Sequence, residues 1–155
     1  MTGVCRPYVI DLSWAREPSL DPFALPGYRG QLWRLHEPMP FVVTLGGEQR
    51  AYEVPAGFVT DGASIPWAFR WLIPQHQTTW APALWHDYVY GSRGWGELTR
   101  QDADDLFGVG LTKQRIPARR VAAMYLVVKR FGGKSWRDDS LMDAHNRAHG
   151  LLATA

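Results

Sequence analysis

The sequence predicts an α+β fold, in which a small N-terminal antiparallel β-sheet packs against three to four C-terminal α-helices. Short β-type runs separated by Pro and Gly fill the first half of the 155-residue chain, and helical spacing of apolar residues fills the second. Hydrophobic residues make up 46% and charged residues 21%, values typical of a globular protein. We therefore expect one domain over residues 1–155, with 1–56 mainly β, 57–77 an ordered loop and 78–152 helical.

Four short strands are expected in the first half, because apolar or alternating runs are bounded there by turn-forming residues: 8–12, 31–35, 41–45 and 50–54. The last two flank Gly46-Gly47-Glu48-Gln49, which is typical of a hairpin turn because glycine adopts positive φ without strain. From Pro55 to Pro74, Pro and Gly residues break the periodicity. This indicates an ordered loop with at most one helical turn near 67–72.

Four helices are expected in the second half, over about 80–90, 100–111, 117–131 and 139–152. Gly91 ends the first helix, and Thr99 with Asp102 resembles the capping box that begins the second. Pro117 suits the first turn of the third helix, which Gly132 ends.

Composition and charge exclude several classes of protein. The net charge is only +2 and the cationic residues are scattered, so we expect no nucleic-acid binding and no strong attraction to an anionic membrane. The single cysteine, Cys5, excludes an internal disulfide framework. Five basic residues around the third helix predict a solvated face: Arg115, Arg119, Arg120, Lys129 and Arg130.

Location and partners are predicted from three further observations. No apolar run approaches the ~20 residues that span a bilayer, so no transmembrane segment is expected. The N-terminal residues lack a basic region followed by a long apolar run, so we expect synthesis in a cytoplasm without a Sec signal. The chain has eight Trp, which we expect mainly in the core, with two or three exposed at a protein interface.

A candidate site comes from the first and second helices. His86 and Tyr90 are four residues apart and share a helix face, while Asp87 points about 100° away from His86. Because the second helix returns after a short loop, we expect Asp104 to accept a hydrogen bond from one ring nitrogen of His86. The other ring nitrogen would then serve as a general base toward water. The alternative is a buried polar network that only fixes helix packing.

Three more residues complete this hypothesis. Asp87 could hold a hard cation such as calcium, together with backbone carbonyls of the loop 57–62. Asp61 and Ser64 are supporting candidates in the same cleft, and tyrosine hydroxyls would brace the carboxylate. The alternative for Asp61 and Ser64 is a hydrogen bond to their own backbone in a turn. A serine nucleophile is not favoured, because Gly-x-Ser-x-Gly is absent.

A second cluster contains Asp143, His145 and His149. The two histidines are four residues apart, the spacing of zinc-binding helices. Asn146 stands where the metalloprotease motif requires Glu, which excludes that chemistry. The alternative is an exposed polar helix.

Three segments in fixed order carry a family resemblance: Gly-Phe-Val-Thr-Asp-Gly-Ala-Ser-Ile-Pro at 57–66, His-Asp-Tyr-Val-Tyr at 86–90 and Arg-Gln-Asp-Ala-Asp-Asp-Leu-Phe at 100–107. Together with Met124-Tyr125 and Phe131-Gly132, they resemble "domain of unknown function 1353", a family common in tailed phages and prophages. The resemblance covers about residues 41–136 and implies a phage or prophage origin. It brings no settled activity.

A more local resemblance concerns mechanism. His-Asp-x-x-Tyr followed by Asp-x-x-Phe on an antiparallel helix is similar to the helix pair of secreted sn-2 phospholipases. This similarity implies that His86 is the general base, that Asp87 ligates calcium and that Asp104 orients the His86 ring. The disulfides of those enzymes have no counterpart here.

Two functions are therefore expected from different classes. One is a phage-encoded, virion-associated hydrolase that acts on a phospholipid ester or a peptidoglycan bond. The other is a non-enzymatic structural protein of a phage tail or neck, which contacts other virion proteins through exposed Trp. An accessory protein that inhibits a host enzyme is a third, less specific expectation.

Overall fold

The computed structural model describes residues 9–61 and 80–153. The first of these ranges contains strands β1 (Ile10–Ser13), β2 (Leu20–Phe23), β3 (Leu32–Leu35), β4 (Met39–Leu45), β5 (Glu48–Val54) and β6 (Val59–Thr60). The second contains helices α1 (Trp80–Gly91), α2 (Arg100–Lys113), α3 (Ala118–Phe131), α4 (Gly133–Arg137) and α5 (Leu141–Ala148), with a 3₁₀ helix η3 (Arg93–Gly96). The predicted α+β class is confirmed. Most of the predicted loop 57–77 lies outside the described residues.

The strands form two antiparallel sheets of three strands each, in the orders β1-β4-β5 and β2-β3-β6, where the sequence predicted one sheet. The predicted hairpin is present, because β4 pairs with β5 across Gly46 and Gly47, both at positive φ. The two sheets separate where β3 ends and β4 begins, at His36-Glu37-Pro38. Since Pro38 has no N–H to donate to a ladder, this position favours a change of sheet over continued pairing.

The elements that the sequence missed are short. β6 has two residues, and β2 contains Pro22, which is tolerated because β2 is an edge strand. The five-residue helix α4 was not expected, and α5 is shorter than the predicted 139–152. α5 begins at a capping box in which Ser140 and Asp143 bond each other's backbone N–H. The predicted capping box of Thr99 and Asp102 is confirmed at the start of α2.

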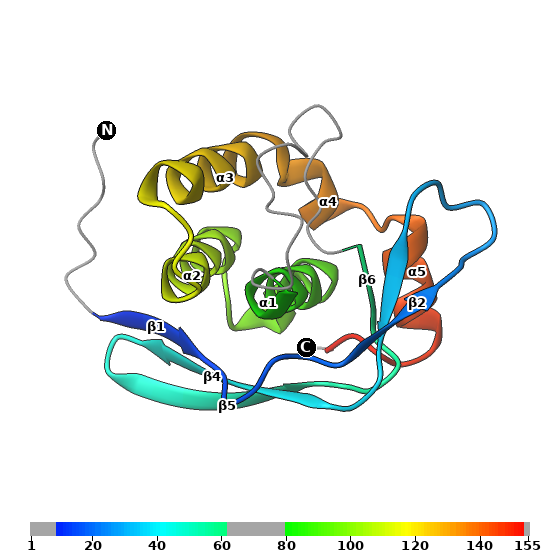
Figure 1. The fold of residues 1–155 in the computed structure, drawn as a ribbon, viewed down its shortest axis with the longest axis horizontal. Helices are drawn as coiled ribbons and strands as arrows, with labels where there is room; N and C mark the ends of the chain where they lie inside the picture. The colour runs from blue at the N-terminus through cyan, green and yellow to red at the C-terminus, as the bar shows by residue number, and fades with distance from the viewer. Residues whose placement is uncertain (1–8, 62–79, 154–155) are drawn as a thin grey trace.

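Helix α1 lies at the centre of the molecule, above the β1-β4-β5 sheet and beside α2, which also packs on β1 (Figure 1). Every residue from Ala81 to Gly91 is buried, as expected of a helix that is apolar on all sides. α2 approaches α1 closely at Gly110, where a Cβ would lie 2.9 Å from the ring of Pro82. The polar side chains of α1 are therefore held inside the protein, where His86, Asp87 and Tyr90 find partners. Trp85 Nε1 has no hydrogen-bond partner among the described residues.

Trp85 anchors the core beneath α1. Its ring contacts Phe41, Tyr52, Tyr88 and Trp95, at centroid distances of 5.4 to 6.2 Å. Among the described Trp side chains, Trp85 is buried and the other four are partly buried: Trp14, Trp33, Trp95 and Trp136. Trp14, Trp95 and Trp136 pack against the core cluster that contains Trp85. The side chains of Trp67, Trp71 and Trp80 lie outside the described residues, so the exposed Trp expected at a protein interface stay a prediction.

Candidate functional site

The centre of the candidate site is a hydrogen bond between α1 and α2. His86 Nε2 lies 3.1 Å from Asp104 Oδ1, and each side chain is only 3% exposed. A carboxylate only accepts hydrogen bonds, so Nε2 carries the proton that is donated to Asp104. The lone pair of the neutral ring is then on Nδ1. This is the tautomer that a general base at Nδ1 requires.

A second donor holds the Asp104 carboxylate. The Tyr90 hydroxyl donates to the same Oδ1 atom at 2.6 Å. Burial, followed by the Asp104 hydrogen bond and charge, raises the pKa of Tyr90, so the phenol keeps its proton. Arg100 Nε in turn donates to the Tyr90 hydroxyl at 3.2 Å, and the Arg100 guanidinium also binds the carbonyl of Val128.

Glycine lets the end of α3 approach this network. A Cβ on Gly132 would lie 2.6 Å from the Tyr90 hydroxyl oxygen, a distance that real Cβ atoms do not reach. The glycine that the sequence predicted as a helix stop therefore also makes room for the tyrosine that supports Asp104.

Two aromatic rings enclose the imidazole of His86. The centroids of Tyr90 and Phe107 lie 4.2 and 4.5 Å from that of His86, and both rings are inclined to it by less than 40°. The residue as a whole is 2% exposed. The orientation of the ring is thus fixed by packing as well as by Asp104.

A different polar group lies on the adjacent face of α1. Thr60, at the end of β6, donates its hydroxyl proton to Asp87 Oδ2 at 2.6 Å. Burial and then the negative charge of Asp61 raise the pKa of Asp87 well above its ordinary value, while the Thr60 hydrogen bond opposes this shift. Asp61 also accepts a hydrogen bond from Tyr28 at 3.3 Å. The structure thus brings Asp61 and Asp87 together, as the sequence hypothesis required.

Asn146 positions this second group, and the sequence did not identify it as a site residue. Its fully buried side-chain amide accepts from Val59 N at 2.9 Å and donates to Val59 O at 2.8 Å. This pair of bonds attaches α5 to the short strand β6 and so holds the neighbouring Thr60 against Asp87. The only sequence signal was a polar residue on the apolar side of α5.

The remaining predicted site residues are placed as follows. Ser64 lies outside the described residues. His145 and His149 stack with their ring centroids 4.2 Å apart, and Asp143 caps α5. Within residues 9–61 and 80–153 there is no group of three or more His, Cys, Asp or Glu side chains that could hold a metal ion. Asp61 and Asp87 are a pair of neighbouring carboxylates among the described residues, and they do not belong to such a group.

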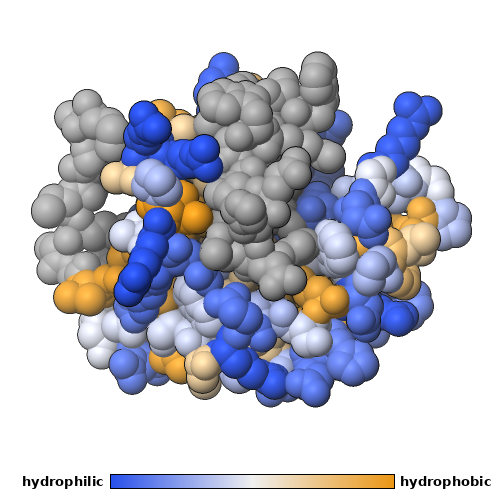
Figure 2. Space-filling view, viewed as in Figure 1, coloured by the Kyte–Doolittle hydropathy of each residue, from blue (hydrophilic) through white to orange (hydrophobic). Residues whose placement is uncertain are grey.

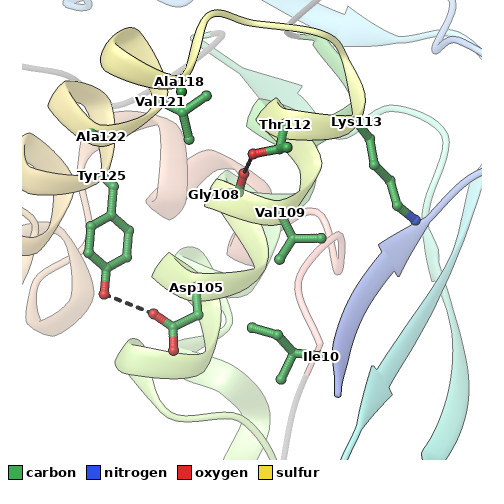
Figure 3. A pocket seen from close by; sticks show the side chains of 10 residues that line it. All are labelled: Ile10, Asp105, Gly108, Val109, Thr112, Lys113, Ala118, Val121, Ala122 and Tyr125. Atoms are coloured by element: carbon green, nitrogen blue, oxygen red, sulfur yellow. Dashed lines mark hydrogen bonds between the residues drawn. The ribbon is translucent and has the colours of Figure 1, made fainter. Parts of the chain in front are cut away.

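A groove of about 680 Å³ lies elsewhere, between α2 and α3 (Figure 3). Its walls are mostly apolar and include Val109 and Thr112 of α2, Val121 of α3 and Ile10 of β1. Tyr125 donates to Asp105 at 2.8 Å across one end of it. Neither His86 nor Asp104 lines the groove, so it is distinct from the candidate site.

Comparisons with known proteins complete this description. Neither the curated proteins nor the solved structures include a match, so the similarity to secreted phospholipases stays a prediction. A family model described as "protein of unknown function (DUF1353)" matches residues 33–128, from β3 to α3. This range contains Thr60, Asp61, His86, Asp87 and Asp104, and it covers more than half of the chain. The predicted resemblance is confirmed, and the protein belongs to the DUF1353 family.

Proposed function

We propose that this protein is a phage-encoded, virion-associated hydrolase that cleaves a phospholipid ester, with His86 as the general base. The observation that carries the proposal is the chain of hydrogen bonds from Tyr90 and His86 to one oxygen of Asp104. This arrangement fixes one imidazole tautomer and leaves Nδ1 basic. We propose an ester rather than a peptidoglycan bond, because a water molecule activated by one imidazole attacks an ester carbonyl more readily than an amide.

In the proposed reaction, Nδ1 of His86 removes a proton from a water molecule while the water oxygen attacks the ester carbonyl carbon. The carbon–oxygen bond to the alcohol then breaks, and the imidazolium returns its proton to the leaving alkoxide. Asp104 stabilises the transient imidazolium, since its charge lies 3.1 Å from Nε2. Arg100 and Tyr90 hold that carboxylate in place.

Asp87 and Asp61 are proposed to bind a divalent cation such as calcium, which would polarise the ester carbonyl. Two adjacent carboxylates in a buried setting fit a hard cation, because the cation replaces both the shared proton and the lost hydration. Among the described side chains they supply two of the six to eight oxygen ligands that calcium takes. Calcium should therefore raise the midpoint of thermal unfolding of the wild type and leave that of Asp87→Asn unchanged.

The test is a comparison of His86→Gln with His145→Gln. Glutamine can still donate an N–H to Asp104 but cannot act as a base, whereas His145 lies on α5, outside the network. We expect His86→Gln to lose fatty-acid release from phospholipid vesicles by about 10²- to 10⁴-fold, with a melting temperature near that of the wild type. His145→Gln should keep full activity. A wild type that hydrolyses neither phospholipid nor peptidoglycan, or an active His86→Gln, would overturn the proposal.

The second candidate is a non-enzymatic structural protein of a phage tail or neck. The 2% exposure of His86, between the rings of Tyr90 and Phe107, favours this role, since a purely structural network needs no access to solvent. Detection of the protein at a fixed copy number in purified virions, together with no turnover of either substrate, would support it. Turnover that depends on His86 would exclude it.

A further inference from the structure

Eight of the seventeen cationic residues lie in one segment of the chain, residues 106–137, which contains none of the fifteen acidic residues. This segment includes all of α3, which lies on the side of α1 and α2 away from the β1-β4-β5 sheet (Figure 1). The modest net charge of +2 therefore conceals a strong separation of charge within the molecule.

The exposed side of α3 combines cations with an apolar side chain. Arg119, Ala122, Leu126 and Lys129 follow one another at intervals of three or four residues, and Arg130 lies four residues after Leu126; all five are exposed and are called here the α3 outer face. Leu126 is 54% exposed, with Arg119 two turns before it and Lys129 and Arg130 in the turn after it. In Figure 2, hydrophilic and hydrophobic side chains lie side by side over α3.

The charges of this face are not neutralised by any acidic side chain of residues 9–61 and 80–153. Elsewhere on the surface, Arg16 pairs with Glu37, Arg50 with Glu97, and Arg147 with Asp139. Among the described residues, no ion pair includes a cation of the α3 outer face. Arg130 instead lies over the ring of Phe131, 5.6 Å from its centroid, and Phe131 is itself 50% exposed. Positive potential and apolar surface thus occur together at the end of α3.

We propose that the α3 outer face docks the protein onto the surface of an anionic phospholipid bilayer. Arg119, Lys129 and Arg130 would contact headgroup phosphates, and Leu126 and Phe131 would enter the interface between headgroups and acyl chains. A lipid surface fits better than nucleic acid, because the phosphate backbone of nucleic acid offers no apolar layer for Leu126. No helix among the described residues is long and apolar enough to cross a membrane, so this binding is peripheral.

The inference concerns binding alone and does not depend on hydrolysis by His86. The full-length protein is mixed with vesicles of phosphatidylcholine, with or without phosphatidylglycerol, and the bound fraction is measured by sedimentation at low and at physiological salt. All measurements are repeated in the His86→Gln background. Normal vesicle binding without phospholipid hydrolysis would contradict the proposed function and leave the proposed membrane binding intact.

The decisive variant is the double charge reversal Arg119→Glu/Arg130→Glu, and its control is Arg29→Glu/Arg34→Glu. The control changes the net charge equally at exposed positions near β2 and β3. We expect the wild type and the control to bind anionic vesicles and not neutral ones, and the α3 variant to bind at least about tenfold more weakly. Leu126→Ser should weaken binding at both salt concentrations, because salt does not screen apolar contacts.

Three results would overturn the proposal. One is a wild type that does not sediment with anionic vesicles, and another is equal loss of binding in the α3 variant and the control. The third is binding of duplex DNA that needs Arg119 and Arg130 while vesicles are not bound, which would assign the face to nucleic acid.

Discussion

The two polar groups on α1 differ in how their carboxylates are balanced. Asp104 receives hydrogen bonds from His86 and Tyr90, and the guanidinium of Arg100 stands behind Tyr90. Asp87 receives a hydrogen bond from Thr60 and lies beside the carboxylate of Asp61. The first group fixes the geometry of the imidazole, whereas in the second group burial and then the negative charge of Asp61 raise the pKa of Asp87.

This difference indicates that the Asp104 group stabilises the fold, whereas the Asp87 group lowers the stability of the folded state. A buried, fully paired network loses stability when one member is removed, because its partners are left without hydrogen bonds. A buried pair of carboxylates destabilises the folded state at neutral pH, which is typical of functional sites rather than of structural ones.

The largest effect is expected for Asp104→Ala. This change leaves the Nε2 proton of His86 and the hydroxyl of Tyr90 buried without their acceptor, and we expect the free energy of unfolding to fall by about 3 kcal/mol. Urea denaturation followed by circular dichroism measures it. Asp138→Ala, at an exposed position, is the control and should change the free energy by less than about 0.5 kcal/mol. An equal effect in both variants would show that the hydrogen bonds of Asp104 do not stabilise the fold.

Asn146→Ala should cost about 2 kcal/mol, because the N–H and carbonyl of Val59 both lose their partner in a buried position. In addition, Thr60 should lose its fixed place beside Asp87. Hydrogen exchange of the Val59 amide measures the local effect, and Asn146→Asp, which keeps one acceptor, should protect that amide better. Unchanged protection in the alanine variant would show that β6 is held by other contacts.

Asp87→Asn should raise stability by about 1 kcal/mol at neutral pH. The pKa of Asp87 is raised in the folded protein, so the folded state keeps this proton to higher pH than the unfolded chain does. The stability that the Asp87 proton contributes is therefore fully present below the ordinary carboxyl pKa of about 4, and it is lost as the pH rises through the raised pKa of Asp87. The midpoint of thermal unfolding of the wild type should fall as the pH rises, and the midpoint of the variant should fall less. A variant that is less stable than the wild type at pH 7 would show that the Asp87 carboxylate does not destabilise the folded protein.

Tyr90→Phe should lower the free energy of unfolding by only about 0.5 kcal/mol, the smallest effect, because Asp104 keeps the hydrogen bond of His86. Under the proposed function, the phospholipid hydrolysis rate should fall only several-fold, since Tyr90 positions Asp104 and does not touch substrate. A loss as large as that of His86→Gln would assign Tyr90 a direct role in the reaction.

The parts of the site that the sequence predicted are those set by local rules. His86 and Tyr90 share a face by helical spacing, and the capping box at Thr99 fixes where α2 begins. A short connection then leaves few ways to pack α2 on α1, so Asp104 could be chosen as the partner of His86 from spacing alone.

The parts that it missed depend on contacts that are distant along the chain. Asn146 and Val59 are 87 residues apart, and β6 has only two residues, too few for a periodic signal. The division of the strands into two sheets also depends on long-range packing. The net charge averaged over the whole chain likewise hid the cationic α3 outer face, although its basic residues could be read from the sequence one by one.

The protonation of the His86 ring is the central claim, and ¹⁵N-edited NMR of the imidazole measures it directly. We expect a proton on Nε2 of His86 and a lone pair on Nδ1, and we expect Asp104→Asn to disturb this tautomer. His149, an exposed ring whose Nδ1 donates to the carbonyl oxygen of His145 at 2.9 Å, serves as the internal reference for a proton on Nδ1. A proton found on Nδ1 of His86 with Nε2 unprotonated would contradict the account, because Asp104 would then not orient a base.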